Sequence, residues 1–594
     1  MARHADRHAT GPNMALSPLL TGTLALVTLA AVAGEAAAQV GAAIDHWRHR
    51  PPVDPLALVL ELADGRTRWP PAGTPLLIAA AAACALIVTA FVVARARRRS
   101  TGTGADRAAR LLGTGRSLHP ISWRNAQATA KRFGVEQPGL PIARAVAGGQ
   151  TLYATWEDMQ CDIWGPRKGK STGRAIPTLL AAPGAAFATS NKPDLYAATR
   201  SIREQGGRVW NFDPEAIAAG EPDWWWNPLS YVTSDRRALE LTDAFVGAYR
   251  DPDARPDPFF DPAGQELVSH LLRAAAIDGR PVTQEFLWST RPNDDEPARI
   301  LQDHGLDLAA ASVLDHVHAP FEQRGGVYGT ARQILSFLRD PDIARWVTSA
   351  GTADRRRHLD LAAFVHSSDT LYLHSKEGQG SSAGLVTALA MALCDAAEQL
   401  AKRSPGGRLP VPLVGVLDEA ANICRWRQLP DLYSHYGSRG IPLLTLLQSW
   451  SQGAQVWGQT GMRKLWGASN VRVYGGGAAE HEFLSDLEKL IGEYNRLVAS
   501  PSSQRAPGGG STSTSWQLTP TPILTVADLA ALPRDRIIVM PSGAPAVLAE
   551  PVYWWNTRQA AEIRESIATH DPPAVLARRH APQPARETPW TTPA

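Results

Sequence analysis

The sequence has few cysteines. Its four, Cys84, Cys161, Cys394 and Cys424, are scattered over 594 residues. They lack the paired spacing that holds zinc or builds a disulfide framework. This argues against a disulfide-stapled scaffold, and we expect small buried thiols in a reducing cytoplasm.

The sequence also has almost no excess of one charge. Sixty Lys and Arg face 57 Asp and Glu, which leaves a net charge of +3. This is too weak to indicate nucleic-acid binding, because local fields decide such binding. The apolar fraction of 44% and the charged fraction of 20% are ordinary for globular protein. A chain this long exceeds one hydrophobic core and indicates more than one domain.

Two long uncharged stretches stand near the N-terminus, at residues 14–34 and 74–93. Each approaches the ~20 residues that a helix needs to cross a bilayer. Arg95 and Arg97 to Arg99 follow the second stretch, and such clusters favour the cytoplasmic side. We predict a multi-pass anchor over residues 1–99 in the cytoplasmic membrane, with the N-terminus and the main body in the cytoplasm.

Two other interpretations of these stretches stay open. Small residues at 36–38 could end a cleaved signal peptide. Either stretch could instead be a buried core helix, although the arginine run argues against this for the second.

Beyond the anchor, the pattern changes twice. Residues 100–149 form a polar, Arg/Ala-rich stem with helical tendency at 105–112 and 123–133. From residue 150, short β-prone runs alternate with amphipathic helices, which indicates an α/β domain with a parallel sheet. The expected strands are 160–164, 185–189, 208–212, 370–374, 413–417, 443–447, 471–474 and 537–540.

The expected sheet domain is interrupted. Helical periodicity dominates between its two parts, so we expect an all-α insertion at 226–350 and a motor domain at 150–225 and 351–568. Residues 501–515 are rich in Gly and Ser and predict a flexible loop. The Pro/Arg-rich end, 569–594, predicts a disordered tail.

A phosphate-binding loop is predicted directly after the first of these strands, where residues 164–172 read WGPRKGKST. Glycines let backbone N–H groups surround phosphate, while Lys170 would contact the β and γ phosphates and Ser171 would ligate Mg²⁺. The predicted ATP-binding residues are Gly165, Pro166, Arg167, Lys168, Gly169, Lys170, Ser171 and Thr172.

This loop departs from the Walker A pattern at its first glycine, where the chain has Trp164 and places Gly165 one position late. Trp164 could stack near a nucleotide or end the strand in the core. We expect the core position.

A second nucleotide motif is the strand VPLVGVLDEA at 411–420, which has the form of a Walker B motif. Asp418 would hold Mg²⁺ together with Ser171, and Glu419 would polarise the attacking water as general base. An acid at a helix N-terminus would be the simpler interpretation. The preceding phosphate loop favours the nucleotide site.

Two further polar residues flank the expected strand at 443–447. Gln448 follows it and could sense the γ-phosphate, because strand C-termini of a parallel sheet converge on one crevice. Arg439 precedes the strand in a Gly-Ser-Arg-Gly turn. It could be an arginine finger that reaches a neighbouring subunit or a solvated loop residue. Lys192 and Asp194 could be switch residues or simple cap and surface groups.

Together, these motifs resemble those of type IV secretion coupling proteins, the TraG/TraD-like conjugative ATPases, in an actinobacterial-type version. The resemblance covers roughly residues 75–555. Besides the nucleotide motifs, it rests on residues 176–180, 188–195, 212–214, 226–229, 370–373, 416–422, 437–440 and 447–448.

The resemblance implies a RecA-like P-loop motor that forms a homo-hexamer and uses ATP and Mg²⁺. It implies DNA as cargo, as a relaxase-bound single strand, with the relaxosome and the secretion channel proteins as partners. Residues 224–226, three tryptophans, could stack on bases or form a buried wedge, and aromatic burial favours the wedge.

Alternative functions stay open. The chain could be an FtsK-like double-stranded DNA translocase, although the tail after Ala568 is too short for a winged helix, or a protein-exporting ATPase. It could also be a scaffold with a degenerate P-loop that does not hydrolyse ATP.

Overall fold

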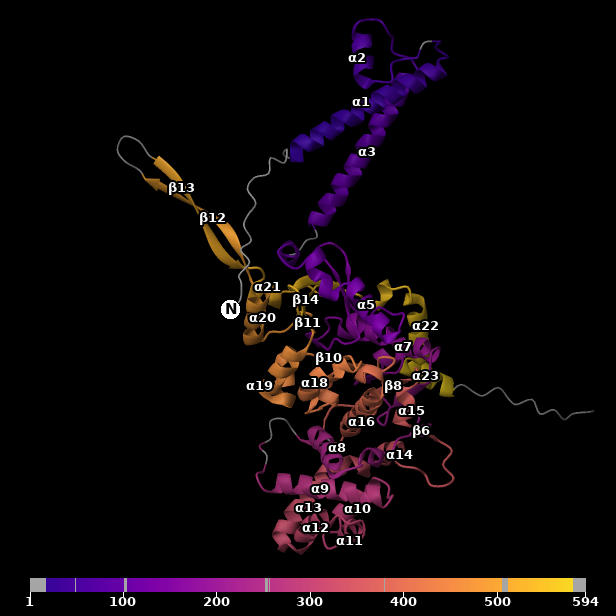
Figure 1. Ribbon diagram of the computed structural model, residues 1–594, viewed down its shortest axis with the longest axis vertical. Coiled ribbons are helices and arrows are strands. Elements are labelled where there is room, and N and C mark those ends of the chain that lie inside the picture. Colours follow the sequence, from indigo (N-terminus) through magenta and orange to yellow (C-terminus); the bar gives the residue numbers. More distant parts are fainter. Residues whose placement is uncertain are drawn as a thin grey trace, which may run out of the picture. The chain divides into compact units, whose positions relative to one another are not determined.

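A computed structural model describes residues 18–48, 50–100, 104–250, 255, 257–378, 380–504 and 511–580. The chain divides into two compact units, which meet in sequence at Gly102 and Thr103. The first unit is helical and contains α1 (Pro18–Ile44), α2 (Pro55–Ala63) and α3 (Gly73–Ser100) (Figure 1). A Cβ on Gly41 would lie 2.5 Å from the Gly73 nitrogen, so α1 and α3 cross where neither has a side chain.

Both apolar N-terminal stretches are helical where the structure describes them, while residues 14–17 lie outside the described part. Ala31–Ile44 and Gly73–Leu86 are its shorter apolar helical segments. Among the described residues, one helix is long and apolar enough to cross a membrane, namely α16 (Ala383–Arg403). Its apolar window is 72% buried in the second unit, so α16 is a core helix there. The two-span anchor therefore stays a prediction.

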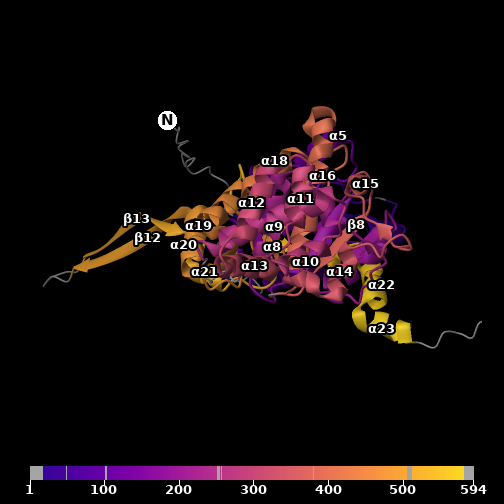
Figure 2. The same ribbon diagram turned by 90° about the horizontal axis from the view of Figure 1, so that it is seen from below.

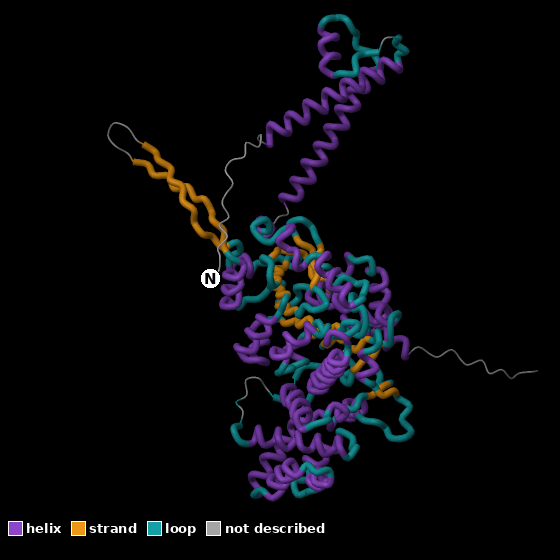
Figure 3. The backbone as a smooth tube through the Cα atoms, in the orientation of Figure 1, coloured by secondary structure: helices purple, strands orange, loops and turns teal. Residues whose placement is uncertain are grey.

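The second unit is built on an eleven-stranded mixed sheet (Figure 3). Seven parallel strands lie in the order β11-β3-β10-β9-β4-β8-β5, and β14, β15, β1 and β2 continue it antiparallel beyond β11. The strands are β1 (Leu140–Ala145), β2 (Thr151–Ala154), β3 (Gln160–Ile163), β4 (Ala186–Ser190), β5 (Val209–Phe212), β8 (Thr370–His374), β9 (Val414–Leu417), β10 (Leu443–Leu447), β11 (Val471–Tyr474), β14 (Ile537–Pro541) and β15 (Val547–Pro551).

All eight expected strands are confirmed, each within a residue or two. The expectation of a parallel sheet is wrong at one end, because β14 runs antiparallel to β11. The structure also differs in the expected stem, where β1 is part of the sheet and pairs with β15. The expected helix at 123–133 is confirmed as α5 (Trp123–Phe133).

Helices cover the sheet and connect its strands. They are α4 (Gly104–Ala108), η1 (Gly115–Ile121), η2 (Ser171–Ala175), α6 (Ile176–Leu180), α7 (Asp194–Glu204), η3 (Pro228–Tyr231), α15 (Leu361–Val365), η5 (Pro405–Gly407), α17 (Ala420–Ile423), α18 (Leu429–Ser438), α19 (Trp450–Ala468), α20 (His481–Ile491), α21 (Val526–Ala530), η6 (Trp554–Asn556), α22 (Ala560–His570) and α23 (Pro572–His580).

A run of helices separates β5 from β8 and begins and ends at two short paired strands, β6 (Trp224–Trp225) and β7 (Arg357–His358). It contains α8 (Asp235–Tyr249), α9 (Phe260–Ile277), α10 (Thr283–Ser289), α11 (Glu296–Asp303), α12 (Asp307–His318), α13 (Phe321–Ile334), η4 (Ser336–Arg339) and α14 (Pro341–Val347).

The tryptophan triplet is largely buried beside this helical run. Trp224 and Trp226 are 3% and 0% exposed. The ring of Trp224 packs edge-on against Trp210 at 5.4 Å and Trp346 at 5.7 Å between centroids. The prediction of a buried wedge is confirmed for these two residues.

Two expectations near the C-terminus are corrected. Residues 501–504 and 511–515, expected in a flexible loop, belong to the ribbon of β12 (Glu493–Gln504) and β13 (Ser511–Pro522). Alternating Ser and Thr can pair as strands, while 505–510 lie outside the described residues. The expected tail begins inside α22 and continues as helix α23, and residues 581–594 are not described.

A buried ion pair lies beneath the predicted phosphate loop. Arg174 and Asp162 are both 0% exposed, and the Arg174 Nε donates to Asp162 Oδ2 at 2.7 Å. Arg174 also donates to the Gln160 side chain at 2.8 Å and to the Pro141 carbonyl at 2.9 Å. Burial raises the pKa of Asp162, and the guanidinium opposes that rise. One side chain thereby joins η2 to β3 and β1.

We predict that Arg174→Met destabilises the folded chain by about 3–5 kcal/mol, because it leaves the Asp162 carboxylate buried without its partner. Urea denaturation followed by tryptophan fluorescence measures this. The double variant Arg174→Met/Asp162→Leu should recover most of the loss. Arg299→Met removes a largely exposed ion pair and serves as the control, with an expected loss below about 1 kcal/mol. Equal losses in Arg174→Met and Arg299→Met would contradict the prediction.

Glu285 in α10 is a second buried acid, and neither of its carboxylate oxygens has a hydrogen-bond partner among the described residues. Burial raises its pKa well above 4.5. Because the folded state holds this proton more tightly than the unfolded state, Glu285 costs stability increasingly as pH rises above about 4.5.

We therefore predict that Glu285→Gln stabilises the chain at pH 8 and that the gain shrinks toward pH 5. Thermal unfolding across that pH range tests this, with the exposed Glu322→Gln as control. A gain independent of pH, or a loss at pH 8, would show the prediction to be wrong.

Candidate nucleotide site

The predicted phosphate loop joins β3 to η2 and α6, and its backbone explains its glycines. Gly169 has φ 95°, and Arg167 also lies in the left-handed region at 60°. A Cβ on Gly165 would lie 2.4 Å from the Gly477 carbonyl oxygen, so only glycine fits there. The Gly165 N–H donates to the Gly476 carbonyl at 2.9 Å. The glycines after β11 therefore hold the start of the loop, a partnership that the sequence analysis missed although 475–477 read GGG.

Trp164 points into the core. It is 0% exposed, and its indole Nε1 donates to Asp162 Oδ2 at 3.3 Å. A Cβ on Gly475 would lie 2.0 Å from the indole ring, so the tryptophan occupies space that this glycine leaves. The prediction that Trp164 ends the strand in the core is confirmed.

Lys170 lies between the two acids that follow β9. Its Nζ is 3.0 Å from Asp418 Oδ1 and 2.6 Å from Glu419 Oε1. The Ser171 hydroxyl donates to Asp418 Oδ2 at 3.3 Å. Burial lowers the pKa of Lys170, but the two carboxylates outweigh it and the net pKa is raised. The ammonium is therefore charged, and it offsets one of the two negative charges beside it.

Gln448 completes this cluster from the end of β10. Its Nε2 donates to both Glu419 oxygens at 2.8 Å. Glu419 has φ 54°, a conformation that turns its side chain at the end of the strand, and Asn422 contacts the same carboxylate at 3.5 Å. The structure thus brings Lys170, Ser171, Asp418, Glu419 and Gln448 together at the edge where the parallel strands end, as expected for such sheets.

A cavity of about 630 Å³ opens over this cluster. It is lined by residues 164–172 together with Asn191, Lys192, Asp194, Asp418, Glu419, Gln448 and Arg534. Burial, followed by the charge of Asp418, raises the pKa of Asp194. The volume, the cations and the exposed loop backbone suit a nucleotide with its phosphates.

Arg534 was not identified from the sequence. It precedes β14, and because β14 runs antiparallel, its first residue lies at the edge where the parallel strands end. Two contacts fasten this segment to the loop side: Lys168 Nζ donates to the Leu532 carbonyl at 2.9 Å, and the Tyr553 hydroxyl donates to the Arg534 carbonyl at 3.0 Å. The sequence did not show that β14 runs antiparallel, so the position of Arg534 at the site could not be predicted.

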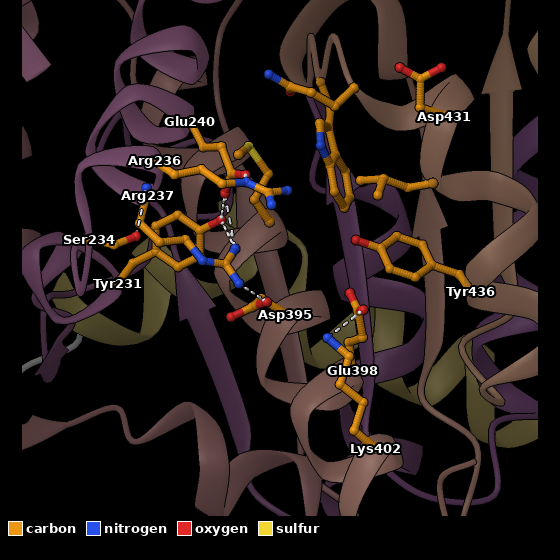
Figure 4. A pocket seen from close by; sticks show the side chains of 14 residues that line it. Tyr231, Ser234, Arg236, Arg237, Glu240, Asp395, Glu398, Lys402, Asp431 and Tyr436 are labelled. Carbon is orange, nitrogen blue, oxygen red and sulfur yellow. Dashed lines mark hydrogen bonds and ion pairs between the residues drawn. The ribbon is translucent and has the colours of Figure 1, made fainter. Parts of the chain in front are cut away.

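Arg439 is not part of this cluster. It follows α18 and precedes β10, so it lies at the opposite end of the strand from Gln448. Its guanidinium pairs with Glu398 Oε1 at 2.8 Å. Glu398 lines a second cavity, of about 490 Å³, between α8, α16 and α18 (Figure 4). Within one chain, Arg439 cannot act on a nucleotide beside Lys170.

A magnesium site fits a small part of this cluster. Among the described residues, no group of three or more His, Cys, Asp or Glu side chains could hold a metal. Mg²⁺ takes few protein ligands when substrate phosphates supply others. The Ser171 hydroxyl and the Asp418 carboxylate, 3.3 Å apart, are hard oxygen donors of that kind.

Comparisons with known proteins agree with these motifs. Residues 412–534 match a family described as the TraM recognition site of TraD and TraG. Over 206 residues the chain is 28% identical to a conjugal transfer protein TraG of Escherichia coli, covering 31% of each protein. It is 22% identical over 403 residues to TraG of Agrobacterium fabrum, covering 65% of this chain and 59% of that protein. The chain spans about a third of the length of the E. coli relatives it matches.

Solved structures share the fold. The bacterial conjugative coupling protein TrwBdeltaN70, in complex with sulphate, matches at 15% identity with a TM-score of 0.50, over 72% of this chain and 92% of that one. TrwB in complex with the non-hydrolysable GTP analogue GDPNP matches at 15% identity with a TM-score of 0.51, over 71% and 92%. The second unit therefore shares the α/β fold of TrwB, with a mixed sheet. The family match, the TraG relatives and this fold support a type IV coupling protein family.

Proposed function

We propose that this protein is a membrane-anchored ATPase that drives DNA, as a relaxase-bound single strand, into a conjugative type IV secretion channel. The observation that carries the ATPase is the cluster of Lys170, Asp418, Glu419 and Gln448 at the mouth of one cavity. The DNA cargo is supported by the TraG relatives, which are conjugal transfer proteins.

Different residues of the nucleotide site have different roles in ATP hydrolysis. The backbone of 165–172 receives the phosphates, and Lys170 exchanges its two carboxylates for phosphate oxygens. Ser171 and Asp418 would hold Mg²⁺, which neutralises charge on the transferring phosphoryl group. Glu419, once Lys170 has left it, polarises the attacking water, and Gln448 keeps its carboxylate in place.

We propose a division of labour along the chain. Residues 1–99 anchor it in the cytoplasmic membrane, 100–139 connect the anchor to the motor, and 140–225 with 351–568 hydrolyse ATP. Residues 226–350 face the relaxosome, and 569–594 form the C-terminal extension.

The helical run is fastened to the motor just beyond the two acids. Gln428 donates to Asp243 Oδ2 in α8 at 2.9 Å, and Arg425 donates to the carbonyls of Gly247 and Arg250 at 3.4 and 3.2 Å. The segment that follows Asp418 and Glu419 thus contacts α8 directly. This supports a route by which hydrolysis moves the insertion.

We propose a homo-hexamer as the working assembly. Arg439 serves a nucleotide only if a neighbouring chain presents it, because its own chain holds it at the far end of β10. In that assembly Arg439 exchanges Glu398 for a phosphate of the adjacent subunit. The cargo alternatives, double-stranded DNA or protein, use the same nucleotide site and differ in which polymer stimulates it.

We predict that Lys170→Ala and Glu419→Gln each lower ATP turnover of the full chain in detergent by about 10²-fold or more. Lys170→Ala should also weaken nucleotide binding, whereas Glu419→Gln should retain it, since it keeps the size and loses only the base. Turnover is measured with single-stranded DNA, with double-stranded DNA and without any polymer. Lys464→Ala, an exposed lysine paired with Asp431, is the control and should behave as the parent.

Unchanged turnover in both site variants would refute the site. Parent protein that binds nucleotide but never hydrolyses it with any polymer would support the non-hydrolysing scaffold. Stimulation by double-stranded DNA alone would favour the FtsK-like alternative.

A further inference from the structure

Among the residues that the structure describes, no further strand pairs with the ribbon of β12 and β13. Its strands pair with each other over twelve residues, from Glu493 with Pro522 to Gln504 with Ser511. It stands away from the helices of the second unit in both ribbon views (Figures 1 and 2). An isolated two-stranded ribbon is marginally stable in water, so we expect another surface to cover it.

One face of the ribbon is apolar in its middle part. Leu497 lies opposite Leu518, and Trp516 lies opposite Ala499, two residues further along. Directly opposed residues, and those two apart, share a face. Leu497, Trp516 and Leu518 are 56%, 63% and 61% exposed and form what we call the hairpin stripe. The other face carries mostly polar pairs, Arg496 with Thr519, Val498 with Gln517 and Ser500 with Ser515.

The same chain has an apolar groove of about 240 Å³ between α19 and α20. Trp450 stacks on Phe483 with 5.4 Å between ring centroids, and Trp466 packs edge-on against Phe483 at 5.8 Å. Leu490 stands at the rim and is 60% exposed. The polar residues that line this groove are Gln459, Arg463, Glu482 and Asp486. We call this the aromatic groove, and its apolar floor with a polar rim has the anatomy of a protein interface.

We propose that the hairpin stripe of one copy binds in the aromatic groove of a second copy of this chain. The ribbon begins at Glu493, two residues after α20 ends, and points away from α20. At roughly 3.3 Å per residue, Leu497 lies about 13 Å out from the ribbon's base, beyond reach of the groove beside that base. A stripe that cannot reach its own groove can reach that of a neighbour.

The stripe and the groove are different surfaces, so the contact between copies is head-to-tail. Each copy offers one of each, and such contacts close into a ring when the rotation permits. The inference rests on the homo-hexamer proposed above and names the surfaces that build it. It places one apolar anchor of each copy, Trp516, in a pocket of aromatic rings, the arrangement typical of interface hot spots.

Disulfide trapping in the full chain in detergent tests this. Cys84, the half-buried native cysteine, is replaced by Ser, while the other three are buried. Leu518→Cys and Leu490→Cys are then combined in one chain. Both sites are exposed, so the substitutions preserve the core. Oxidation should give a ladder of covalent oligomers on a non-reducing gel. The control is a chain with Gln517→Cys and Leu490→Cys. Gln517 lies on the ribbon face opposite to Leu518, so this chain should give at least about tenfold less covalent oligomer.

Mixing chains that carry one cysteine each identifies the contact. Leu518→Cys with Leu490→Cys chains should give dimers and nothing larger. Dimers from Leu518→Cys alone would mean that two ribbons pack on each other. In the chain that carries both cysteines, an internal disulfide would mean that the ribbon covers its own groove. Either result, or no trapping above the control, overturns the inference.

A charge variant provides an independent measurement. Trp516→Glu should weaken assembly about 30-fold or more in sedimentation velocity, and Gln517→Glu should not. Nucleotide binding is measured on the same samples and should be retained, because Lys170 and its partners lie within one chain and only the contact from the neighbour's Arg439 is lost. Lost trapping with retained ATP turnover would refute only the groove contact, whereas lost turnover in the parent would refute the proposed function.

Discussion

The pairing of Arg174 with Asp162 is the constraint on which the site depends. A guanidinium that is fully buried must satisfy its donors inside the protein. Arg174 does so with the side chains of Asp162 and Gln160 in β3 and with the backbone of β1. Three strands separate β1 from β3 in the sheet order, a flat distance of about 19 Å at the usual strand spacing. One side chain can bridge both only if the antiparallel end of the sheet curls around η2. This pair fixes both β3, where the phosphate loop begins, and η2, where the loop ends.

The direction of each strand then decides which residues meet. Lys170, Asp418 and Gln448 follow parallel strands and converge where those strands end. Arg534 reaches the same edge by the opposite route, because it precedes an antiparallel strand. Arg439 precedes a parallel strand and is therefore held at the far edge, paired with Glu398. The same rule explains the four residues that meet and the one that does not.

This rule also marks how much the sequence could predict. Parallel strands buried on both faces read as continuous apolar runs, so β9 and β10 were predictable, and with them Asp418 and Gln448. The strand β1 contains proline and arginine, and β13 is built from Ser and Thr, so neither gives that signal. Trp164 stands where the Walker A pattern has its first glycine. The structure explains how it is accommodated, because the indole fills the space beside Gly475. Long-range partners, rather than local propensity, were what the sequence left out.

Lys170 shows why the cluster has two acids and an amide. Its ammonium already contacts Asp418 and Glu419, so phosphate oxygens must compete with both carboxylates for it. When Lys170 turns to phosphate, Asp418 remains with the Ser171 hydroxyl and Glu419 remains with the Gln448 amide. Each acid thus keeps a neutral hydrogen-bond donor after the cation leaves, which limits the cost of leaving a charge unpaired in a buried place. In the mechanism proposed above, Gln448 in this way lets a single lysine link phosphate binding to release of Glu419, the carboxylate proposed to act on water.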